Sequence, residues 1–598
     1  MAKIKFNEQQ IKAINHTNGP AMVVAGAGSG KSTVLVHRID NLIDNGVDQE
    51  DIVAITFTKN SADDLKRKLN DLGILDVRVG TFHSVLSRLL SENGINVFKT
   101  VPPFEIKKAF NEVNFNSDVD DILSFISYQK SYMKSYNDVF VAKESKYTDY
   151  ELSRYFKIYE DLKKSNNAYD FDDWLIEALK ILKVKPHAFE CKYLLVDEHQ
   201  DNNMIQNILI KEMCPSENIM VIGDYRQSIY SFRGAEPKYF MNFKEQYPNA
   251  EVIHLDNNYR SREDIIHTSN RFIKNYFGGY EYYSDSVPTV KEKATINFEI
   301  YESKEDEAED VANAIQNMIE LEGIKPKDIS ILYRMNNMTS DIEVALTKRN
   351  IPYHIENDSN FFKSRQLIPI ISVLRLIEDG KDDEAFLNIL KSRCYPFTFI
   401  PKKVVPDIEM YAFENGLSYM ESSVKMYLPQ KQKQSFTTFK NIVTSLRARY
   451  KDEELTTKEV IEKIVFLLKM DDYIESNWNG EEQDRRRDSI ISFTKFAQNS
   501  TIKAFLKFIH SNNNNSKSKD ANAVQLMTIH RSKGLEWDNV FLIGLEEGKF
   551  PSKKATLEEE ARLFYVATTR PKKFLHICQN GQDNIFGNQY RGLPITKK

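Results

Sequence analysis

The chain has 598 residues, of which 28% are charged and 41% hydrophobic, and its formal net charge is −5. This length exceeds what one hydrophobic core supports and predicts roughly three to five domains. The composition is ordinary for a soluble protein. The small net charge does not exclude nucleic-acid binding, because binding requires only a local basic stripe.

Four widely spaced cysteines argue against a zinc site, an iron–sulfur cluster and a disulfide framework. They are Cys191, Cys214, Cys394 and Cys578. The start of the chain lacks the apolar core of a signal peptide, and no stretch of 18 apolar residues follows. We therefore expect a soluble cytoplasmic protein without a membrane partner.

A glycine-rich segment near the start of the chain predicts a nucleotide-binding loop. It follows the apolar run 21–24, which is typical of a buried strand, and precedes 33–39, which is typical of a helix. Backbone N–H groups of such a loop surround phosphate oxygens, while a lysine serves the outer phosphates and a serine hydroxyl serves Mg²⁺. The alternative is a Gly/Ala/Ser loop that only connects the strand to the helix and binds no nucleotide. The segment consists of Ala25, Gly26, Ala27, Gly28, Ser29, Gly30, Lys31 and Ser32.

Several apolar runs downstream predict further strands of the same domain. Residues 193–198 and 219–224 both end in acidic residues, and the run 52–58 precedes an amphipathic segment at 61–72. Alternating strands and helices predict a parallel α/β sheet, with ligands at the carboxyl ends of its strands. Residues 86–168 interrupt this pattern with helical periods.

A second α/β set follows, with strand-like runs at 296–300, 329–333, 524–528 and 540–544. The intervening segment, about 375–520, has helical periodicity and ends in the polar run 511–520, which predicts a loop or linker. We therefore expect an α/β protein with two parallel-sheet domains, each carrying a largely helical insertion. The expected boundaries are 1–85 and 169–275 for the first domain, 86–168 for its insertion, 276–375 and 521–598 for the second domain, and 376–520 for its insertion.

Asp197 and Glu198, at the end of a predicted strand, are natural partners of the phosphate loop. One carboxylate there can hold Mg²⁺ through water, and its neighbour can orient or deprotonate the attacking water. Gln227 is a candidate for positioning that water. Arg260 and Arg570 are candidates for neutralising charge on the transferred phosphoryl group, although most arginines lie on the surface and contribute little.

Taken in chain order, these segments resemble the UvrD/Rep/PcrA-type superfamily 1A DNA helicases. Each element alone is a weak signal, whereas their joint occurrence from residue 6 to residue 570 is very specific. The elements are FN with Gln10 (6–10), AGAGSGKS (25–32), TFT (56–58), GTFHS (80–84), DFDD (170–173), VDEHQD (196–201), GDYRQSIYSFRGA (223–235), NYRS (258–261), LMTIHRSKGLEW (526–537) and EEARLFYVATTR (559–570).

The resemblance implies an ATP–Mg²⁺ site between two RecA-like motor domains. It assigns Gln10 to the adenine edge, Tyr259 to stacking on the base and Glu536 to the ribose. An ordinary surface glutamine and a half-buried tyrosine are the alternatives for the first two. The resemblance places Lys31, Ser32, Asp197, Glu198 and Gln227 around the phosphates and the metal, completed across the interdomain cleft by Arg260 and Arg570.

The resemblance also implies that single-stranded DNA crosses both domains. Aromatic rings that stack on bases, together with phosphate contacts, permit tracking without sequence preference. Core packing is the alternative for such rings. His83 and His530 lack the spacing of metal ligands and are candidates for polar contacts. The matching positions are Phe57, Tyr230 and Phe232 for stacking, and Thr81, His83, Arg233, Arg334 and His530 for backbone or base contacts.

The sequence departs from the family pattern at several places. Thr33 stands where relatives often carry an arginine, and Phe232 where they often carry tryptophan. Tyr225 and Arg226 replace an acidic pair. Residues 393–403 lack the expected Gly-Ile-Gly element that grips duplex DNA, for which Lys402 and Lys403 offer an electrostatic substitute or form only a solvated loop.

We therefore expect an ATP- and Mg²⁺-dependent 3′→5′ single-stranded DNA translocase and helicase, acting at single-strand/duplex junctions. The sequence leaves its pathway open between DNA repair, plasmid or phage replication, and defence. The alternative is a DNA-sensing ATPase subunit that regulates a partner nuclease in a recombination, repair or anti-phage defence complex. A degenerate structural relative is a third possibility, which the intact motifs disfavour. The sequence leaves open whether the protein is a monomer or part of a partner-dependent assembly.

Overall fold

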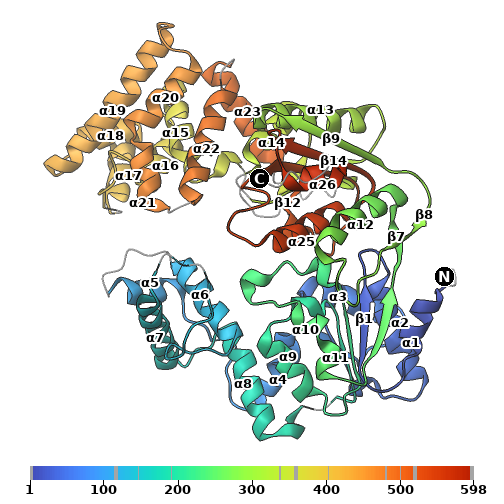
Figure 1. The fold of residues 1–598 in the computed structure, drawn as a ribbon. Coiled ribbons are helices and arrows are strands. Elements are labelled where there is room, and N and C mark those ends of the chain that lie inside the picture. Colours follow the sequence, from blue (N-terminus) through green and yellow to red (C-terminus); the bar gives the residue numbers. More distant parts are fainter. Residues whose placement is uncertain are drawn as a thin grey trace. The chain divides into compact units, whose positions relative to one another are not determined.

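The computed structural model forms two compact units, drawn in Figure 1. Unit 1 comprises Met1–Ile296, Phe550–Leu575 and Asp583–Lys598, and unit 2 comprises Asn297–Lys549 and His576–Gln582. The division into four domain segments expected from the sequence stays a prediction. The structure describes residues 5–97, 99–112, 119–143, 145, 147–189, 191–335, 338–355, 361–401, 403–478, 481–497, 500–515 and 522–592.

Unit 1 is built on a six-stranded sheet with the order β3-β2-β4-β5-β1-β6. Its neighbouring strands all run parallel. Parallel strands are covered on both faces and therefore consist of near-continuous apolar runs, as in β1 and β5, which are buried throughout. The strands are β1 (Ala21–Ala25), β2 (Ile52–Ile55), β3 (Arg78–Gly80), β4 (Tyr193–Val196), β5 (Ile219–Gly223) and β6 (Glu251–Leu255).

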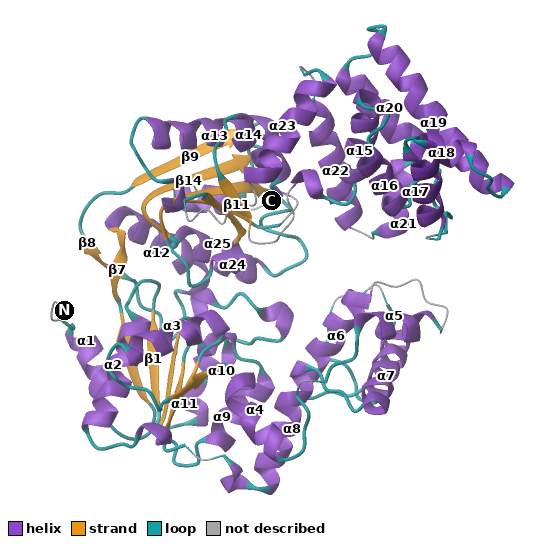
Figure 2. Ribbon diagram, turned by 180° about the vertical axis from the view of Figure 1, so that it is seen from behind, coloured by secondary structure: helices purple, strands orange, loops and turns teal. Residues whose placement is uncertain are grey.

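Helices cover both faces of this sheet. They are α1 (Glu8–Asn15), α2 (Lys31–Asp44), α3 (Lys59–Asn70), α4 (Phe82–Glu92), α8 (Phe171–Val184), α9 (Met204–Met213), α10 (Lys238–Met241) and α11 (Phe243–Gln246). The longer helix α12 (Glu263–Phe277) follows them in the chain. Helices α1 and α2 lie to one side of the strands and α4, α8 and α9 to the other (Figures 1 and 2). The hydroxyls of Thr58 and Thr81 cap α3 and α4 by accepting from the backbone N–H of Ser61 and Ser84, which fixes where these helices begin.

The strand order determines which loops meet at the carboxyl edge of the sheet. Strand β5 lies between β4 and β1, so the segments that follow these three strands are neighbours. They carry Asp197, Asp224 and the glycine-rich segment 26–30. This edge is where open parallel sheets bind ligands, as expected from the strand-like runs in the sequence.

The first helical insertion has its own small core. It contains α5 (Pro103–Asn111), α6 (Val119–Ser131) and α7 (Asp149–Asn166), whose buried side chains form one cluster. The ammonium groups of Lys130 and Lys163 are buried and pair with Asp170 and Asp173. These carboxylates form the capping box of α8, so the buried charges fasten the insertion to the helix that leads back to the sheet.

The segment 550–575 packs within unit 1. Its helix α25 (Leu557–Thr568) and the later α26 (Ile585–Arg591) pack against α12. The ring of Phe272 on α12 lies 4.7 Å from that of Phe564 and 5.4 Å from that of Phe586. Strands β7 (Asn257–Arg262) and β8 (Val287–Val290) form a separate parallel pair on either side of α12 in the chain.

Unit 2 carries the second six-stranded sheet, of order β11-β12-β10-β13-β14-β9. Strand β10 pairs in parallel with β12 and β13, and β12 with β11. The strands are β9 (Thr295–Tyr301), β10 (Ile329–Tyr333), β11 (Tyr353–Ile355), β12 (Val524–Thr528), β13 (Trp537–Glu546) and β14 (Pro571–Asn580), with helices α13 (Lys304–Glu320), α14 (Ser340–Lys348) and α24 (Ile529–Ser532). The α/β class with two parallel-type sheets, expected from the sequence, is confirmed.

The described residues between 367 and 515 form a series of helices that share one large apolar core. The helices are α15 (Leu367–Glu378), α16 (Asp383–Ser392), α17 (Val404–Asn415), α18 (Tyr419–Lys425), α19 (Gln430–Lys451), α20 (Thr457–Leu467), α21 (Met470–Asn477), α22 (Glu481–Phe496) and α23 (Ile502–Asn515). The prediction of a loop over 511–520 is wrong for 511–515, which continue α23, while 516–521 lie outside the described residues. Ile502, Phe505 and Ile509 of α23 are buried in the helical core. Once this part of the helix has formed, its extension by a few polar residues costs little free energy.

The four cysteines are free thiols and buried, in agreement with the absence of a disulfide framework from the sequence pattern. Among the described residues no helix is both long enough and apolar enough to span a bilayer. The expected cytoplasmic location stays a prediction.

Candidate active site

The phosphate loop runs from the last residue of β1 to the first turn of α2. Gly28 has φ +69° and Gly30 has φ +86°, left-handed values that a residue with a side chain adopts only under strain. Gly30 is the N-cap of α2, so the free N–H groups of this helix begin where the loop ends. Ala25 lies in the strand and is fully buried, which explains why alanine serves here in place of glycine.

Side chains from two other segments hold the loop. Gln10 Nε2 donates to the carbonyl oxygen of Ser29 over 3.2 Å. Asn258 Nδ2 donates to the Ala27 carbonyl over 2.6 Å, and the Tyr259 N–H to the Gly28 carbonyl over 2.9 Å. The predicted adenine-site residues Gln10 and Tyr259 therefore both contact the phosphate loop.

Lys31 forms an ion pair with Glu198, with 2.9 Å between Nζ and Oε1. Burial alone would lower the pKa of Lys31, but the carboxylates of Glu198, Asp197 and Asp224 outweigh it, and the pKa lies above its usual value. Lys31 is therefore a permanent cation at the loop. Gln200 Nε2 donates to the other oxygen, Glu198 Oε2, over 2.5 Å.

The backbone of Glu198 is held in an unusual conformation. Its φ and ψ are 51° and 39°, left-handed values that cost a non-glycine residue roughly 1–2 kcal/mol. Strain of this kind persists where surrounding contacts determine the geometry, often at functional sites. It directs the carboxylate from the end of β4 toward Lys31.

Gln227 and Arg570 meet although 343 positions separate them in the chain. Arg570 Nη2 donates to Gln227 Oε1 over 3.2 Å, and its Nε to the carbonyl of Val566 over 2.8 Å. Arg260 Nη1 donates to the Thr569 carbonyl over 3.3 Å. The two predicted phosphate-neutralising arginines thus adjoin each other beside Gln227, and Arg570 is almost fully buried.

The donor set at the loop suits a magnesium ion. The Ser32 hydroxyl and the Asp197 carboxylate supply the oxygen ligands that Mg²⁺ prefers, and both come from segments at the carboxyl edge of the sheet. Glu160, Asp170 and Asp173 also lie close enough together to share a cation. There, however, Lys130 and Lys163 already provide the positive charge.

The predicted DNA-contacting residues of unit 1 line one cavity of about 670 Å³. The rings of Phe57 and Tyr230 stack with centroids 4.8 Å apart. Phe232 is 48% exposed, and the Arg233 guanidinium lies 5.6 Å from its ring centre. The cavity is also lined by Thr81, His83 and Asp197, so it reaches the acidic pair of the phosphate site.

His83 lies against aromatic rings in this cavity. Its Nε2 is 3.0 Å from the Phe171 carbonyl oxygen, and its ring packs edge-on against that of Phe171. Burial lowers the pKa of His83, so the ring is neutral at physiological pH. A neutral ring with one occupied nitrogen suits a polar contact rather than a phosphate ion pair.

The three predicted site residues of unit 2 lie at two places. Arg334 directly follows β10, and His530 is the second residue of α24, which follows β12. These two strands pair, with Tyr333 opposite Thr528. Arg334 and His530 therefore share the carboxyl edge of the second sheet. Glu536 precedes β13 and so lies at the amino end of the strands. Its assignment to the ribose stays a prediction.

Comparison with known proteins agrees with this geometry. Residues 6–248 match the UvrD/REP helicase N-terminal domain, and residues 253–582 match the UvrD-like helicase C-terminal domain. The chain belongs to the UvrD-like helicase family.

Curated relatives align over nearly the whole chain. The ATP-dependent DNA helicase PcrA of Bacillus subtilis (strain 168) is 30% identical over 97% of this chain and 84% of its own length. The protein of the same name from Staphylococcus epidermidis is 29% identical over 98% of this chain and 85% of its own length, as is that from Staphylococcus aureus.

Within this UvrD-like chain, the segment that replaces the expected Gly-Ile-Gly element is built differently. Phe397 packs in the helical core, 5.2 Å from the ring of Phe436, whereas Phe399 is 92% exposed. Lys402 lies outside the described residues, and Lys403 is the N-cap of α17. The loop is thus anchored by an aromatic side chain rather than shaped by glycines.

Two functional contacts of the UvrD-like site were not foreseen from the sequence. Asn258 holds the phosphate loop, and Arg226 pairs with Asp224. The position of Asn258 directly before Tyr259 and Arg260 is the one signal available for it. The sequence marked Arg226 only as a basic residue at a position where the family pattern has an acidic one.

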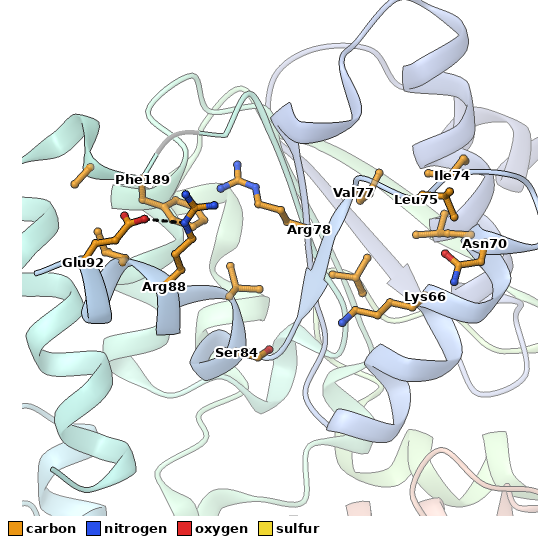
Figure 3. A pocket seen from close by; sticks show the side chains of 15 residues that line it. Lys66, Asn70, Ile74, Leu75, Val77, Arg78, Ser84, Arg88, Glu92 and Phe189 are labelled. Atoms are coloured by element: carbon orange, nitrogen blue, oxygen red, sulfur yellow. Dashed lines mark hydrogen bonds and ion pairs between the residues drawn. The ribbon is translucent and has the colours of Figure 1, made fainter. Parts of the chain in front are cut away.

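A further cavity of about 770 Å³ lies at the edge strand β3 of unit 1 (Figure 3). It is flanked by α3 and α4, with Lys66 on one side and Arg88, paired with Glu92 over 2.8 Å, on the other. The side chains lining it include none of the predicted ATP or DNA residues. We therefore do not assign it to the UvrD-like active site.

Proposed function

We propose that the protein is an ATP-dependent DNA helicase that moves 3′→5′ along single-stranded DNA. The direction follows from the family resemblance. One observation supports the coupling of ATP to DNA: the aromatic cavity and the phosphate site share Asp197, and Gln227 of the phosphate site lies three residues before Tyr230 of the cavity. A strand stacked on Tyr230 and Phe232 thereby acts on the segment that orients Gln227.

The chemistry at the phosphate site follows from its charges. Lys31 is proposed to leave Glu198 for the outer phosphates of ATP, which frees the Glu198 carboxylate to orient or deprotonate water. Mg²⁺, held by Ser32 and Asp197, would neutralise phosphate oxygens. Arg570 and Arg260 are proposed to stabilise charge developing on the transferred phosphoryl group.

Coupling of hydrolysis to movement is proposed to follow the inchworm scheme implied by the family. ATP draws the two motor domains together, and hydrolysis releases them. Gln227 would report the state of the γ-phosphate to the aromatic loop at 228–235, because the two share one continuous segment. Stacking on aromatic rings tolerates any base, which suits a motor that must pass every sequence.

Strand displacement tests both activity and direction. A labelled strand is displaced from duplexes carrying a 3′ tail, a 5′ tail or no tail, with ATP and Mg²⁺. A 3′→5′ motor displaces the strand only from the 3′-tailed duplex. Preference for the 5′ tail would overturn the direction, and no displacement beside normal DNA-stimulated ATP hydrolysis would overturn autonomous unwinding.

The segment around Phe397 and Phe399 favours a second candidate function. Without glycines that let the backbone approach phosphate, this loop grips duplex DNA less closely, and autonomous unwinding suffers. The chain would then act as a DNA-sensing ATPase subunit of a complex with a nuclease or repair protein. Strand displacement that appears only after such a protein is added would select this alternative.

A further inference from the structure

Arg226 is a buried cation beside Gln227 in the 3₁₀ turn η4 (Tyr225–Gln227). Its Nε donates to Asp224 Oδ1 over 2.8 Å, and its Nη2 to Asp224 Oδ2 over 3.3 Å. Its Nη1 donates to the carbonyl of Ser284 over 2.9 Å. The planar fork thus holds both carboxylate oxygens at once, which a lysine ammonium cannot reproduce.

The same guanidinium also contacts α25, the helix that ends two residues before Arg570. Its centre lies 5.6 Å from the Tyr565 ring of α25 and 5.8 Å from the Tyr283 ring. Burial acts to lower the pKa of Arg226, but Asp224 and the surrounding tyrosines raise it by more, so the pKa lies above its usual value. Arg226 is therefore a fixed positive charge between the Asp224 carboxylate and α25.

A chain of hydrogen bonds leads from Arg226 to Arg570. Asp224 Oδ2 accepts from Gln227 Nε2 over 2.8 Å, and Gln227 Oε1 accepts from Arg570 Nη2 over 3.2 Å. Because the carboxylate holds the donor end of the Gln227 amide, the acceptor end is directed at Arg570. The orientation of Gln227 thus depends on Asp224, which has no exposed surface.

We propose that Arg226 is a positioning residue for ATP hydrolysis, which fixes Asp224 and, through it, orients Gln227 toward Arg570. Without Arg226 the buried Asp224 carboxylate loses the guanidinium that holds both of its oxygens, so the carboxylate can move and the Gln227 amide is no longer held. Arg226 also adjoins the phosphate loop, since a Cβ on Gly26 would lie 3.2 Å from its Nη2. This inference rests on the proposed ATPase function of the site.

The test compares steady-state ATP hydrolysis, with saturating single-stranded DNA, in Arg226→Gln, Arg226→Lys and the wild type. Arg226→Gln should lower kcat about 10- to 100-fold, the range for losing a group that orients a functional side chain, with little change in KM for ATP. Arg226→Lys keeps the charge but not the fork, so we expect an intermediate kcat. Wild-type kcat in either variant would overturn the inference.

Arg562→Gln is the matched control for docking of α25. Arg562 Nε donates to the Tyr225 carbonyl over 3.1 Å, and its guanidinium lies 4.7 Å from the Phe277 ring centre. It therefore joins α25 to the same turn without touching Asp224. We expect a lower melting temperature and a nearly unchanged kcat, whereas equal losses of kcat in Arg562→Gln and Arg226→Gln would reduce Arg226 to a docking role.

A double substitution separates positioning from a merely structural effect. If Arg226 acts through Gln227, then Arg226→Gln combined with Gln227→Ala should be no slower than Gln227→Ala alone. Multiplied losses would contradict the inference. A wild-type protein without DNA-stimulated ATP hydrolysis would instead overturn the proposed function itself, so the two failures are distinguishable.

Discussion

Replacing Gly28 by alanine perturbs the phosphate loop at its tightest point. Gly28 has φ +69°, and a Cβ there would lie 2.7 Å from Arg260 Cβ and 2.9 Å from Asn258 Nδ2. The left-handed conformation costs alanine about 1–2 kcal/mol, and relieving an overpacked contact adds about 1–3 kcal/mol. The neighbour that must move is the segment whose Asn258 side chain holds Ala27.

Gly46→Ala is the matched control, since Gly46 has φ +86° and no atom within 4 Å of the added Cβ. Both glycines belong to unit 1, so their effects on unfolding can be compared directly. We expect the free energy of unfolding of Gly46→Ala to fall only by the cost of the left-handed backbone, about 1–2 kcal/mol, and nucleotide binding to be normal. Gly28→Ala should lose more and also bind nucleotide more weakly.

The assay pairs urea unfolding, followed by circular dichroism, with titration of a fluorescent ATP analogue. We expect at least about tenfold weaker nucleotide binding for Gly28→Ala, which corresponds to about 1.4 kcal/mol. If both variants unfold alike and bind the analogue alike, the contact between β7 and the loop does not shape the site, and the reasoning is refuted.

Three further substitutions test other parts of the account. Arg570→Ala should bind the fluorescent ATP analogue but hydrolyse ATP at least about 1,000-fold more slowly, and unchanged turnover would remove its proposed role. Phe232→Ala should keep DNA-stimulated ATP hydrolysis, because Tyr230 still stacks on the strand, while slowing translocation in a stopped-flow assay. The exposed Tyr150→Ala is the control, and full speed of Phe232→Ala would count against stacking. Burial raises the pKa of Glu307 from 4.5 to about 7. The folded state therefore loses stability as the pH rises from 4.5 to about 7, because the carboxyl ionises at lower pH in the unfolded chain than when it is buried. Glu307→Gln should therefore stabilise unit 2 by up to about 3 kcal/mol at pH 8 and have little effect at pH 4.5, measured by urea unfolding; equal effects at both pH values would exclude this titration.

Local patterns predicted the elements around the phosphate loop well, because their signals lie within short segments. Buried parallel strands are apolar runs, and the glycines at 28 and 30 mark left-handed backbone. The prediction for the polar run at 511–515 was wrong because it also relied on a short local pattern. Its local composition favours a loop, but the packed stripe before it extends α23 through Asn515.

Long-range contacts of the site could not be derived from local patterns. The pairing of Arg570 with Gln227 was accessible only through the family resemblance, since hundreds of residues intervene. The contacts of Asn258 with the loop and of Arg226 with Asp224 depend on how β7 and η4 pack. No residue type or spacing marks them in advance.

ATP hydrolysis with and without single-stranded DNA measures whether Lys31 and Glu198 form a phosphate site that is coupled to the aromatic cavity. The wild type should hydrolyse ATP slowly alone and many times faster with DNA. Lys31→Ala and Glu198→Gln should abolish turnover while retaining DNA binding by fluorescence anisotropy. Turnover that persists in either variant, or a wild-type rate that ignores DNA, would contradict the account.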